Sequence, residues 1–308
     1  MEMTVIRAGV LTTVQDAGRP GHRAMGLPPG GAADAFALRV ANLLVGNPED
    51  AAALECTLVG PELVFSADTT IAVGGASFES FPSWQPVRVR AGEPVGLGPC
   101  RTGCRGYIAV AGGIDVAPVL GSRSTYLPAK LGGLEGGALR DGDRLPLGTA
   151  IRSGSIGHWH INPSLLPAYS ASPVLRVIRG AQAEEFDSVW LKAEFKVTSK
   201  FDRMGLRLNG PKLARTKDWE LPSAAVAPGT VQVPPDGQPI ILLADAQTIG
   251  GYPKLAHAIG VDQPLVAQLQ TGGTVRFQEV ALAEAQRLWL ARERDLGILR
   301  EGLAQKFK

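Results

Sequence analysis

The sequence lacks several features by which common classes of protein are recognised. Its 308 residues include only three cysteines, and no apolar run approaches the ~20 residues that span a bilayer. The 31 Lys and Arg residues nearly balance the 29 Asp and Glu residues, and no dense basic stretch occurs. We therefore expect neither nucleic acid nor a membrane as a partner. The few cysteines fit a reducing compartment, and Met1–Ile6 lacks the apolar core of a signal peptide, so we expect a cytoplasmic location.

Familiar nucleotide-binding and hydrolase motifs are also missing. The sequence contains no P-loop, no Gly-x-Gly-x-x-Gly after a strand, no His-Glu-x-x-His and no Gly-x-Ser-x-Gly. No lysine lies between methionines in a biotin-attachment sequence. We therefore expect no covalent biotin on this chain and no ATP held in a familiar loop.

The cysteines do not predict a metal site. Cys100 and Cys104 have zinc-like spacing, but only Cys56 remains as a further thiol. The pair His158 and His160 offers nitrogen ligands. We favour small buried thiols in a turn over a metal centre.

What the sequence has in excess is glycine and proline. Its 38 glycines and 23 prolines make about a fifth of the chain, well above the roughly 12% of an average protein. The apolar fraction is ordinary, so this is a packed protein with many turns and short strands. We predict a mainly β fold of two related barrels or sandwiches. The turn-rich stretch 150–173 suggests domains at 1–160 and 161–308.

Two helices stand out from this pattern. Phe36, Val40, Leu43 and Leu44 share one apolar face, and Gly46 follows as a stop. A second helix is predicted from about Val280 to Leu303, with mixed charges on its polar face.

Four polar segments rich in glycine are candidates for a site. The first is Gly30–Asp34, where Asp34 is either a plain helix cap or part of an anion site, with Asn42 two turns along the helix. The second is Gly121–Tyr126. There Arg123, flanked by Ser122, Ser124 and Tyr126, either grips an anion or belongs to a loop that satisfies itself.

The third segment is Ser199–Leu208, in which Arg203 either pairs with Asp202 or a distant acid, or reaches an anionic ligand. The fourth follows the buried-type strand Ile240–Ala244. It brings Asp245, Gln247, Thr248, Gly250 and Gly251 together, a set suited to recognising an amide or carboxylate. The stretch Val231–Pro239 is predicted to form a neighbouring hairpin.

These segments resemble one family closely. It is the allophanate hydrolase subunit 2 family, also called KipA or biotin-dependent carboxyltransferase-like, whose bacterial members include the C subunit of ATP-dependent 5-oxoprolinase. The matching strings run in order along almost the whole chain: Thr12–Arg19, Gly30–Asp34, Ala41–Asn47, Leu54–Leu58, Gly121–Tyr126, Asp202–Gly205, Pro228–Pro234 and Asp245–Pro253. Ala246 stands where an arginine is common in this family.

The resemblance implies two cyclophilin-like β-barrel domains with a few short helices and a C-terminal helix. It implies first a component of an ATP-dependent 5-oxoprolinase complex that opens 5-oxoproline to L-glutamate. One alternative is a carboxyltransferase-type subunit that acts on urea or allophanate with a biotin-dependent partner. Another is a KipA-like regulator that binds a KipI-like kinase inhibitor.

The 5-oxoprolinase interpretation also implies partners and roles. The partners are the A subunit and a KipI-like B subunit of the complex, the substrate is a small amide or lactam, and the complex uses ATP, with Mg. Asp245, Gln247 and Thr248 are the expected catalytic residues, and Arg123 or Arg203 is expected to hold the substrate carboxylate. The expected substrate-binding set is completed by Asp34, Asn42, Ser122, Ser124, Tyr126, Gln232, Gly250, Gly251 and Tyr252.

Overall fold

The computed structural model describes residues 1–150, 160–217 and 220–306. By contacts the chain groups into two compact units. The first combines Met1–Arg19, Gly30–Leu166 and Arg294–Lys308, and the second combines Pro20–Pro29 with Pro167–Glu293. The domain ranges expected from the sequence, 1–160 and 161–308, are continuous, whereas each unit combines separate stretches of chain.

The first unit is built on two sheets. The four-stranded sheet has the order β7-β4-β1-β9, and the five-stranded sheet has the order β2-β3-β8-β5-β6. The strands are β1 (Glu2–Arg7), β2 (Leu11–Gln15), β3 (Ala53–Thr57), β4 (Glu62–Phe65), β5 (Thr69–Phe78), β6 (Pro86–Val89), β7 (Val95–Gly96), β8 (Cys100–Val110) and β9 (Arg144–Pro146). All their pairings are antiparallel.

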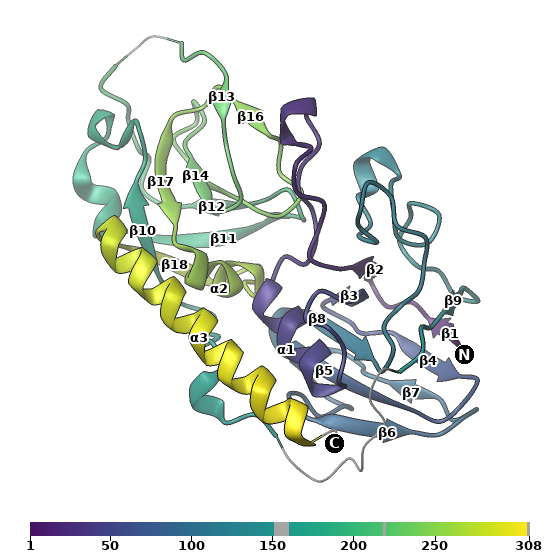
Figure 1. Cartoon of the computed structure of the whole chain (residues 1–308). Coiled ribbons are helices and arrows are strands. Elements are labelled where there is room, and N and C mark those ends of the chain that lie inside the picture. Colours follow the sequence, from purple (N-terminus) through teal and green to yellow (C-terminus); the bar gives the residue numbers. More distant parts are fainter. Residues whose placement is uncertain (151–159, 218–219, 307–308) are drawn as a thin grey trace. The chain divides into compact units, whose positions relative to one another are not determined.

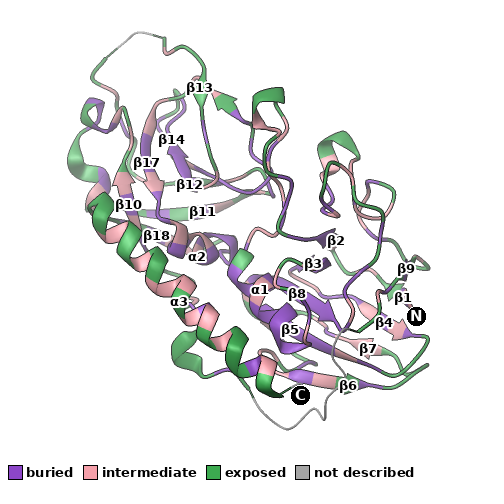
Figure 2. Cartoon of the chain, in the orientation of Figure 1, coloured by how far each residue is buried: buried purple, intermediate pink, exposed green. Residues whose placement is uncertain are grey.

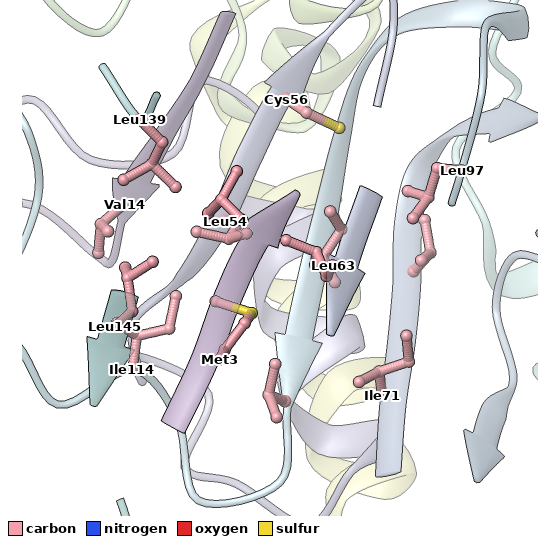
Figure 3. Close-up of a cluster of buried hydrophobic side chains, with 14 of the residues drawn as sticks. Met3, Val14, Leu54, Cys56, Leu63, Ile71, Leu97, Ile114, Leu139 and Leu145 are labelled. Carbon is pink, nitrogen blue, oxygen red and sulfur yellow. The ribbon is translucent and has the colours of Figure 1, made fainter. Parts of the chain in front are cut away.

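The main core of the first unit is made by side chains from both sheets. Met3 on β1 and Leu63 on β4 are fully buried with Leu54 on β3 and Ile71 on β5 (Figure 3). Alternation along β5 and β8 turns every second residue to the other face of the five-stranded sheet. That sheet is therefore buried on both faces.

Helix α1 (Ala35–Leu44) covers that other face. Its buried residues cluster with Ala72 of β5 and with Tyr107 and Ala109 of β8. Gly46 follows the helix with a φ of 78°, the left-handed conformation that ends helices readily at glycine. The helix predicted from the apolar spacing is confirmed.

The second unit contains a closed barrel of seven strands, in the order β10-β17-β14-β15-β12-β11-β18 (Figure 1). The strands are β10 (Val174–Arg179), β11 (Glu194–Phe201), β12 (Gly205–Asn209), β14 (Thr230–Gln232), β15 (Ile240–Leu242), β17 (Lys254–Ala258) and β18 (Thr274–Glu279). The pairing of β10 with β18 is parallel and closes the barrel. Trp190, Phe195 and Phe277 pack in its core.

A two-stranded ribbon, β13 (Ala224–Ala225) with β16 (Ile249–Gly250), accompanies this barrel. Strands β14 and β15 pair antiparallel across the turn at Pro234–Gly237, which confirms the hairpin predicted for Val231–Pro239. Among the described residues, the other helical segments are α2 (Gln263–Ala267), α3 (Leu282–Lys306) and six short 3-10 turns: Arg23–Met25, Leu127–Ala129, Pro163–Leu165, Ala183–Glu185, Ser188–Leu191 and Gly260–Asp262.

The mainly β class with few helices and a long C-terminal helix is confirmed. Helix α3 is mostly exposed, with Leu296 and Leu303 as its buried residues (Figure 2). Those two leucines join the cluster of α1 in the first unit. In the part of the chain that the structure describes, no helix is both long and apolar enough for a bilayer crossing.

Candidate binding cleft

The polar loop Gly121–Tyr126 of the first unit is organised around a carboxylate, that of Asp16. Its Oδ1 accepts hydrogen bonds from Ser122 Oγ (2.6 Å), Ser124 Oγ (2.5 Å) and Gly18 N (2.8 Å). Its Oδ2 accepts one from the backbone N–H of Arg123 (2.5 Å). Both hydroxyls, predicted to bind substrate, are buried and bound to this carboxylate. The polar groups of the loop are thus hydrogen-bonded within the protein, as one of the two interpretations of its sequence proposed.

The Arg123 side chain turns to the rim of the same loop. Its Nη2 lies 2.8 Å from Oδ1 of Asp115, and its Nε donates to the carbonyl of Val116 at 2.8 Å. Tyr126 forms a backbone bridge with Leu131. The Arg123 side chain and the Tyr126 backbone therefore both belong to the framework of the loop.

Asp34 at the N-cap of α1 and Asn42 within the helix, both predicted to bind substrate, are fully buried. Asp34 caps the helix by accepting from Ala37 N at 2.9 Å. Asn42 donates to the carbonyl of Ala51 (2.7 Å), and its Oδ1 accepts from Asn47 Nδ2 (3.0 Å). Of the two interpretations of Asp34, this geometry fits the helix cap.

A buried network lies beside that cap. The Tyr107 hydroxyl donates to Oε2 of Glu55 at 2.7 Å and accepts from the N–H of Asp34 at 2.8 Å. Burial, together with the charge of Glu55, raises the pKa of Tyr107 well above its usual value. Tyr107 therefore stays protonated, and its hydroxyl connects Glu55 to the backbone of Asp34 by hydrogen bonds.

The cysteines lie in strands of the first unit, so their predicted place in a turn is wrong. Cys56 is on β3, and Cys100 and Cys104 are on β8. Burial raises the pKa of Cys100 to about 12 and that of Cys56 further, so the unreactive thiol forms prevail at neutral pH. Over the described residues no group of three or more His, Cys, Asp and Glu could hold a metal. His158 lies outside that range.

In the second unit, Arg203 and Asp245 are bound to each other. Arg203 Nε lies 2.8 Å from Asp245 Oδ2, and Arg203 Nη2 lies 3.1 Å from Oδ1. Both side chains are at least 95% buried. Of the three partners considered for Arg203 from the sequence, namely Asp202, a distant acid and an anionic ligand, the structure therefore shows the distant acid, Asp245. The pair joins the turn before β12 to the segment after β15, and so connects the third and fourth polar segments of the sequence.

Beside this pair a cleft of about 400 Å³ opens on the second unit. The third and fourth polar segments both line it, together with strands β14 and β15. Three of the predicted site residues line this cleft: Gln232, Gln247 and Tyr252. Further lining residues are Ser199, Lys200, Phe201, Asp202, Met204, Gly205, Arg207, Ile240 and Leu242.

Gln232 is the polar centre of one wall. Its side chain is almost fully buried. The Nε2 donates to the carbonyl of Tyr252 (3.2 Å), and the Oε1 accepts from Gln247 Nε2 (3.4 Å). A Cβ placed on Gly250 would come within 3.0 Å of Gln232 Nε2, so glycine there makes room for this amide. Gly250 pairs with Ala224 in the β13–β16 ribbon, and Thr248 is buried, with its carbonyl accepting from Val226 N.

Strand register explains why Gln232 and Arg207 share this wall. Ile240 on β15 is the cross-strand partner of both Arg207 on β12 and Gln232 on β14. Partners directly opposite each other lie on the same face of a sheet. The neighbours of these residues along their strands, Leu206, Ile241 and Val231, are fully buried in the barrel core. Because side chains alternate along a strand, the row Arg207–Ile240–Gln232 lies on the outer face.

Two cations that line this cleft lie in the third polar segment, Ser199–Leu208, but were not among the predicted site residues. Lys200 and Arg207 are exposed, and within residues 1–150, 160–217 and 220–306 neither side chain forms an ion pair. Asp202 on the same rim is engaged in the turn, where its Oδ1 accepts from Met204 N (2.7 Å) and Gly205 N (3.0 Å). The alternation Leu206-Arg207-Leu208 was the available signal, because it places Arg207 outside the barrel.

Ala246, where the family commonly has an arginine, does not line the cleft. It is buried in a small apolar cluster with Val226 and Leu242. A cleft with two amides and two cations has the donors and acceptors to hold a small molecule that carries an amide and an anionic group.

Comparison with known proteins agrees with the resemblance found in the sequence. The family model "Carboxyltransferase domain, subdomain A and B" matches residues 25–279. The C subunit of 5-oxoprolinase from Escherichia coli (strain K12) is 42% identical over 299 residues, which cover 92% of this chain and 93% of that protein. The protein of the same name from Haemophilus influenzae is 39% identical over 289 residues, 90% of each.

A solved structure shows the same fold at full length. The urea carboxylase of Kluyveromyces lactis superposes with a TM-score of 0.91 at 29% identity, over 98% of this chain. The chain spans 29% of that larger protein. The chain belongs to the carboxyltransferase-domain family, subdomain A and B.

Proposed function

Proceeding from this family membership, we propose that the chain is a component of an ATP-dependent 5-oxoprolinase complex, which opens 5-oxoproline to L-glutamate. The observation that carries the proposal is the end-to-end match to the C subunit of 5-oxoprolinase, 42% identical over 92% of this chain and 93% of that protein. The cleft on the second unit supports it, because 5-oxoproline is a small lactam with a carboxylate.

The chemistry of the reaction explains why ATP is needed. Resonance stabilises the lactam, so direct attack by water on its carbonyl is slow. Transfer of the γ-phosphoryl group of ATP to the lactam oxygen gives a better-activated carbon. Water then attacks that carbon, the C–N bond breaks with the nitrogen taking up a proton, and a second water accounts for release of phosphate. Glutamate, ADP and phosphate are the products.

In this proposal the chain's own residues hold the substrate. The amides of Gln232 and Gln247 offer a donor and an acceptor that complement the lactam C=O and N–H. Asp245, expected to be catalytic, is buried against Arg203, so we assign it to positioning the segment that carries Gln247. Gln247 remains the proposed substrate contact, and Thr248 supports the ribbon beside it.

Other components come from the rest of the complex. We propose a KipI-like B subunit and the A subunit of 5-oxoprolinase as partners, and Mg-ATP as the cosubstrate of the assembled complex. No residue of this chain is assigned to ATP.

Co-expression with the A and B subunits tests the proposal. We expect the purified complex to form glutamate from 5-oxoproline only with ATP, and neither urea nor allophanate to stimulate ATP hydrolysis. A complex that lacks this chain is the control and should be inactive. Glutamate formation that is independent of this chain, or urea-dependent ATP hydrolysis alone, would overturn the proposal.

The match to urea carboxylase favours a second candidate, carboxyl transfer from carboxybiotin to urea or a related amide. Because we expect no covalent biotin on this chain, that reaction needs a carrier in trans. A pull-down separates the two: recovery of a biotin carboxylase favours carboxyl transfer, and recovery of the A subunit favours 5-oxoprolinase.

A further inference from the structure

We propose that Arg207 and Lys200 form the binding site for the carboxylate of the small amide substrate, in place of Arg123 or Arg203. The inference rests on the proposed function and assigns the anion-binding residues of the cleft. It starts from four arginine and lysine side chains that differ in what they already bind.

The two arginines that the sequence singled out are engaged within the protein. Arg203 forms its two-point contact with Asp245, and both are buried. Arg123 contacts Asp115 and the carbonyl of Val116. Using either for a substrate carboxylate requires breaking an ion pair, and for Arg203 it would leave Asp245 buried without its counter-charge.

Arg207 and Lys200 have no such commitment. Neither side chain has an ion pair among the described residues, and both line the 400 Å³ cleft. The guanidinium of Arg207 presents a planar fork that matches a carboxylate at two points, and the Lys200 ammonium adds a point charge.

A local irregularity brings Lys200 to the side of Arg207. The pairing of β11 with β12 shifts register between Val197 and Phe201, whose partners are Leu208 and Leu206. Four residues of β11 thus span two of β12, and the extra residues bulge opposite Arg207. Thr198 Oγ1 fixes the bulge by donating to the carbonyl of Arg207 at 3.1 Å. Such bulges commonly re-aim a side chain beside a binding site.

The rest of the wall argues for a carboxylate attached to an amide rather than for a phosphate. Gln232 lies in the same outward row as Arg207, one strand beyond Ile240. Its amide is held by Tyr252 and Gln247 and faces the cleft. An anion on Arg207 and an amide on Gln232 therefore belong to one small molecule, as the carboxylate and lactam of 5-oxoproline do.

Steady-state kinetics of the assembled complex tests this assignment. We expect Arg207→Gln to raise the KM for L-5-oxoproline at least tenfold and Lys200→Gln severalfold. The kcat should stay within about threefold, because binding shared by substrate and transition state is what is lost. Arg207→Lys should restore part of the loss. The matched control is Lys196→Gln, an exposed lysine of the same strand outside the cleft, which should stay within twofold.

Three results would overturn the assignment. One is a KM for 5-oxoproline in Arg207→Gln equal to that of the control. Another is a rise in the KM for ATP instead, which would assign the cations to phosphate. A third is a fall in thermal stability of Arg207→Gln large enough to account for the kinetics, with no selective effect on KM after correction for folded protein.

A binding measurement separates this inference from the proposed function. If the wild-type complex forms no glutamate, the function fails, and equilibrium dialysis of the full chain with L-5-oxoproline and with 2-pyrrolidinone still decides the inference. We expect wild-type chain to retain 5-oxoproline in preference to 2-pyrrolidinone, which lacks the carboxylate, and Arg207→Gln to lose that preference. Equal retention by both proteins, or no retention by either, would contradict the inference.

Discussion

The polar loop of the first unit and the cleft of the second unit contain similar kinds of residue but use their polar groups in opposite ways. In the loop, one carboxylate collects two hydroxyls and two backbone N–H groups, and Arg123 turns to Asp115. In the cleft, Lys200 and Arg207 have no ion pair among the described residues. Polar residues in glycine-rich loops therefore mark two different things: a cluster that stabilises the fold, and a surface that can bind a ligand.

The buried pair of the second unit belongs with the first kind, although it borders the cleft. Asp245→Ala would leave the Arg203 guanidinium buried without its acid, so we expect the largest effect here, a loss of about 3–5 kcal/mol of unfolding free energy. Urea unfolding followed by tryptophan fluorescence measures it. The control Asp236→Ala, an exposed turn residue, should cost under about 1 kcal/mol.

A double change sharpens that prediction. Replacing both partners, Arg203→Leu with Asp245→Leu, should cost less than the sum of the two single changes, because no unpaired charge stays buried. Additive losses would show that the two side chains do not depend on each other.

The Asp16 cluster is the corresponding test in the first unit. Asp16→Ala removes the acceptor of four hydrogen bonds and should cost about 3 kcal/mol, since bonds to a charged group are each worth roughly 1.5–3 kcal/mol and water replaces some of them. Asp115→Ala, which removes only the exposed partner of Arg123, should cost under about 1 kcal/mol. Equal losses in the two variants, read from urea midpoints, would refute the structural role of the cluster.

The smallest expected effect on stability comes from the buried thiols at alkaline pH. Burial raises the pKa of Cys56 far above the ~8.5 of an unfolded thiol. The contribution of the neutral thiol is therefore complete below about pH 8.5, and it is lost as the pH rises toward the folded-state pKa. Under reducing conditions, Cys56→Ala should make the decline in unfolding free energy between about pH 9 and 10.5 shallower by about 1 kcal/mol per pH unit. An unchanged slope would contradict this.

Helix α1 and the polar segments that border the cleft could be predicted from the sequence, because each is specified by residues close together in the chain. The spacing of Phe36, Val40 and Leu44 specifies α1, and the polar segments after β11 and β15 are recognisable from their residues alone. The conflict between Asp34 as cap and Asp34 as ligand was already present in the sequence. The structure shows the cap, because the Asp34 carboxylate accepts from Ala37 N, while the hydroxyl of Tyr107, 73 residues away, accepts from the backbone N–H of Asp34.

The choice among arginines could not be predicted, because it depends on which of them forms an ion pair in the folded chain. Arg203 and Asp245 are 42 residues apart, and Arg123 differs from Arg207 in having an acid within reach. In the string Leu206-Arg207-Leu208, Arg207 has the pattern of an ordinary solvent-exposed residue. Only the strand order β12-β15-β14 brings it into one row with Gln232.

The most direct test compares Arg123 with Arg207 in one assay. We would measure the KM for L-5-oxoproline in the complete complex with Arg123→Gln and with Arg207→Gln. The account predicts that Arg207→Gln raises KM at least tenfold, whereas Arg123→Gln, which loses only the contacts with Asp115 and the carbonyl of Val116, stays within twofold of wild type. The reverse order, with Arg123→Gln raising KM and Arg207→Gln leaving it unchanged, would contradict the distinction between the self-satisfied loop and the open cleft.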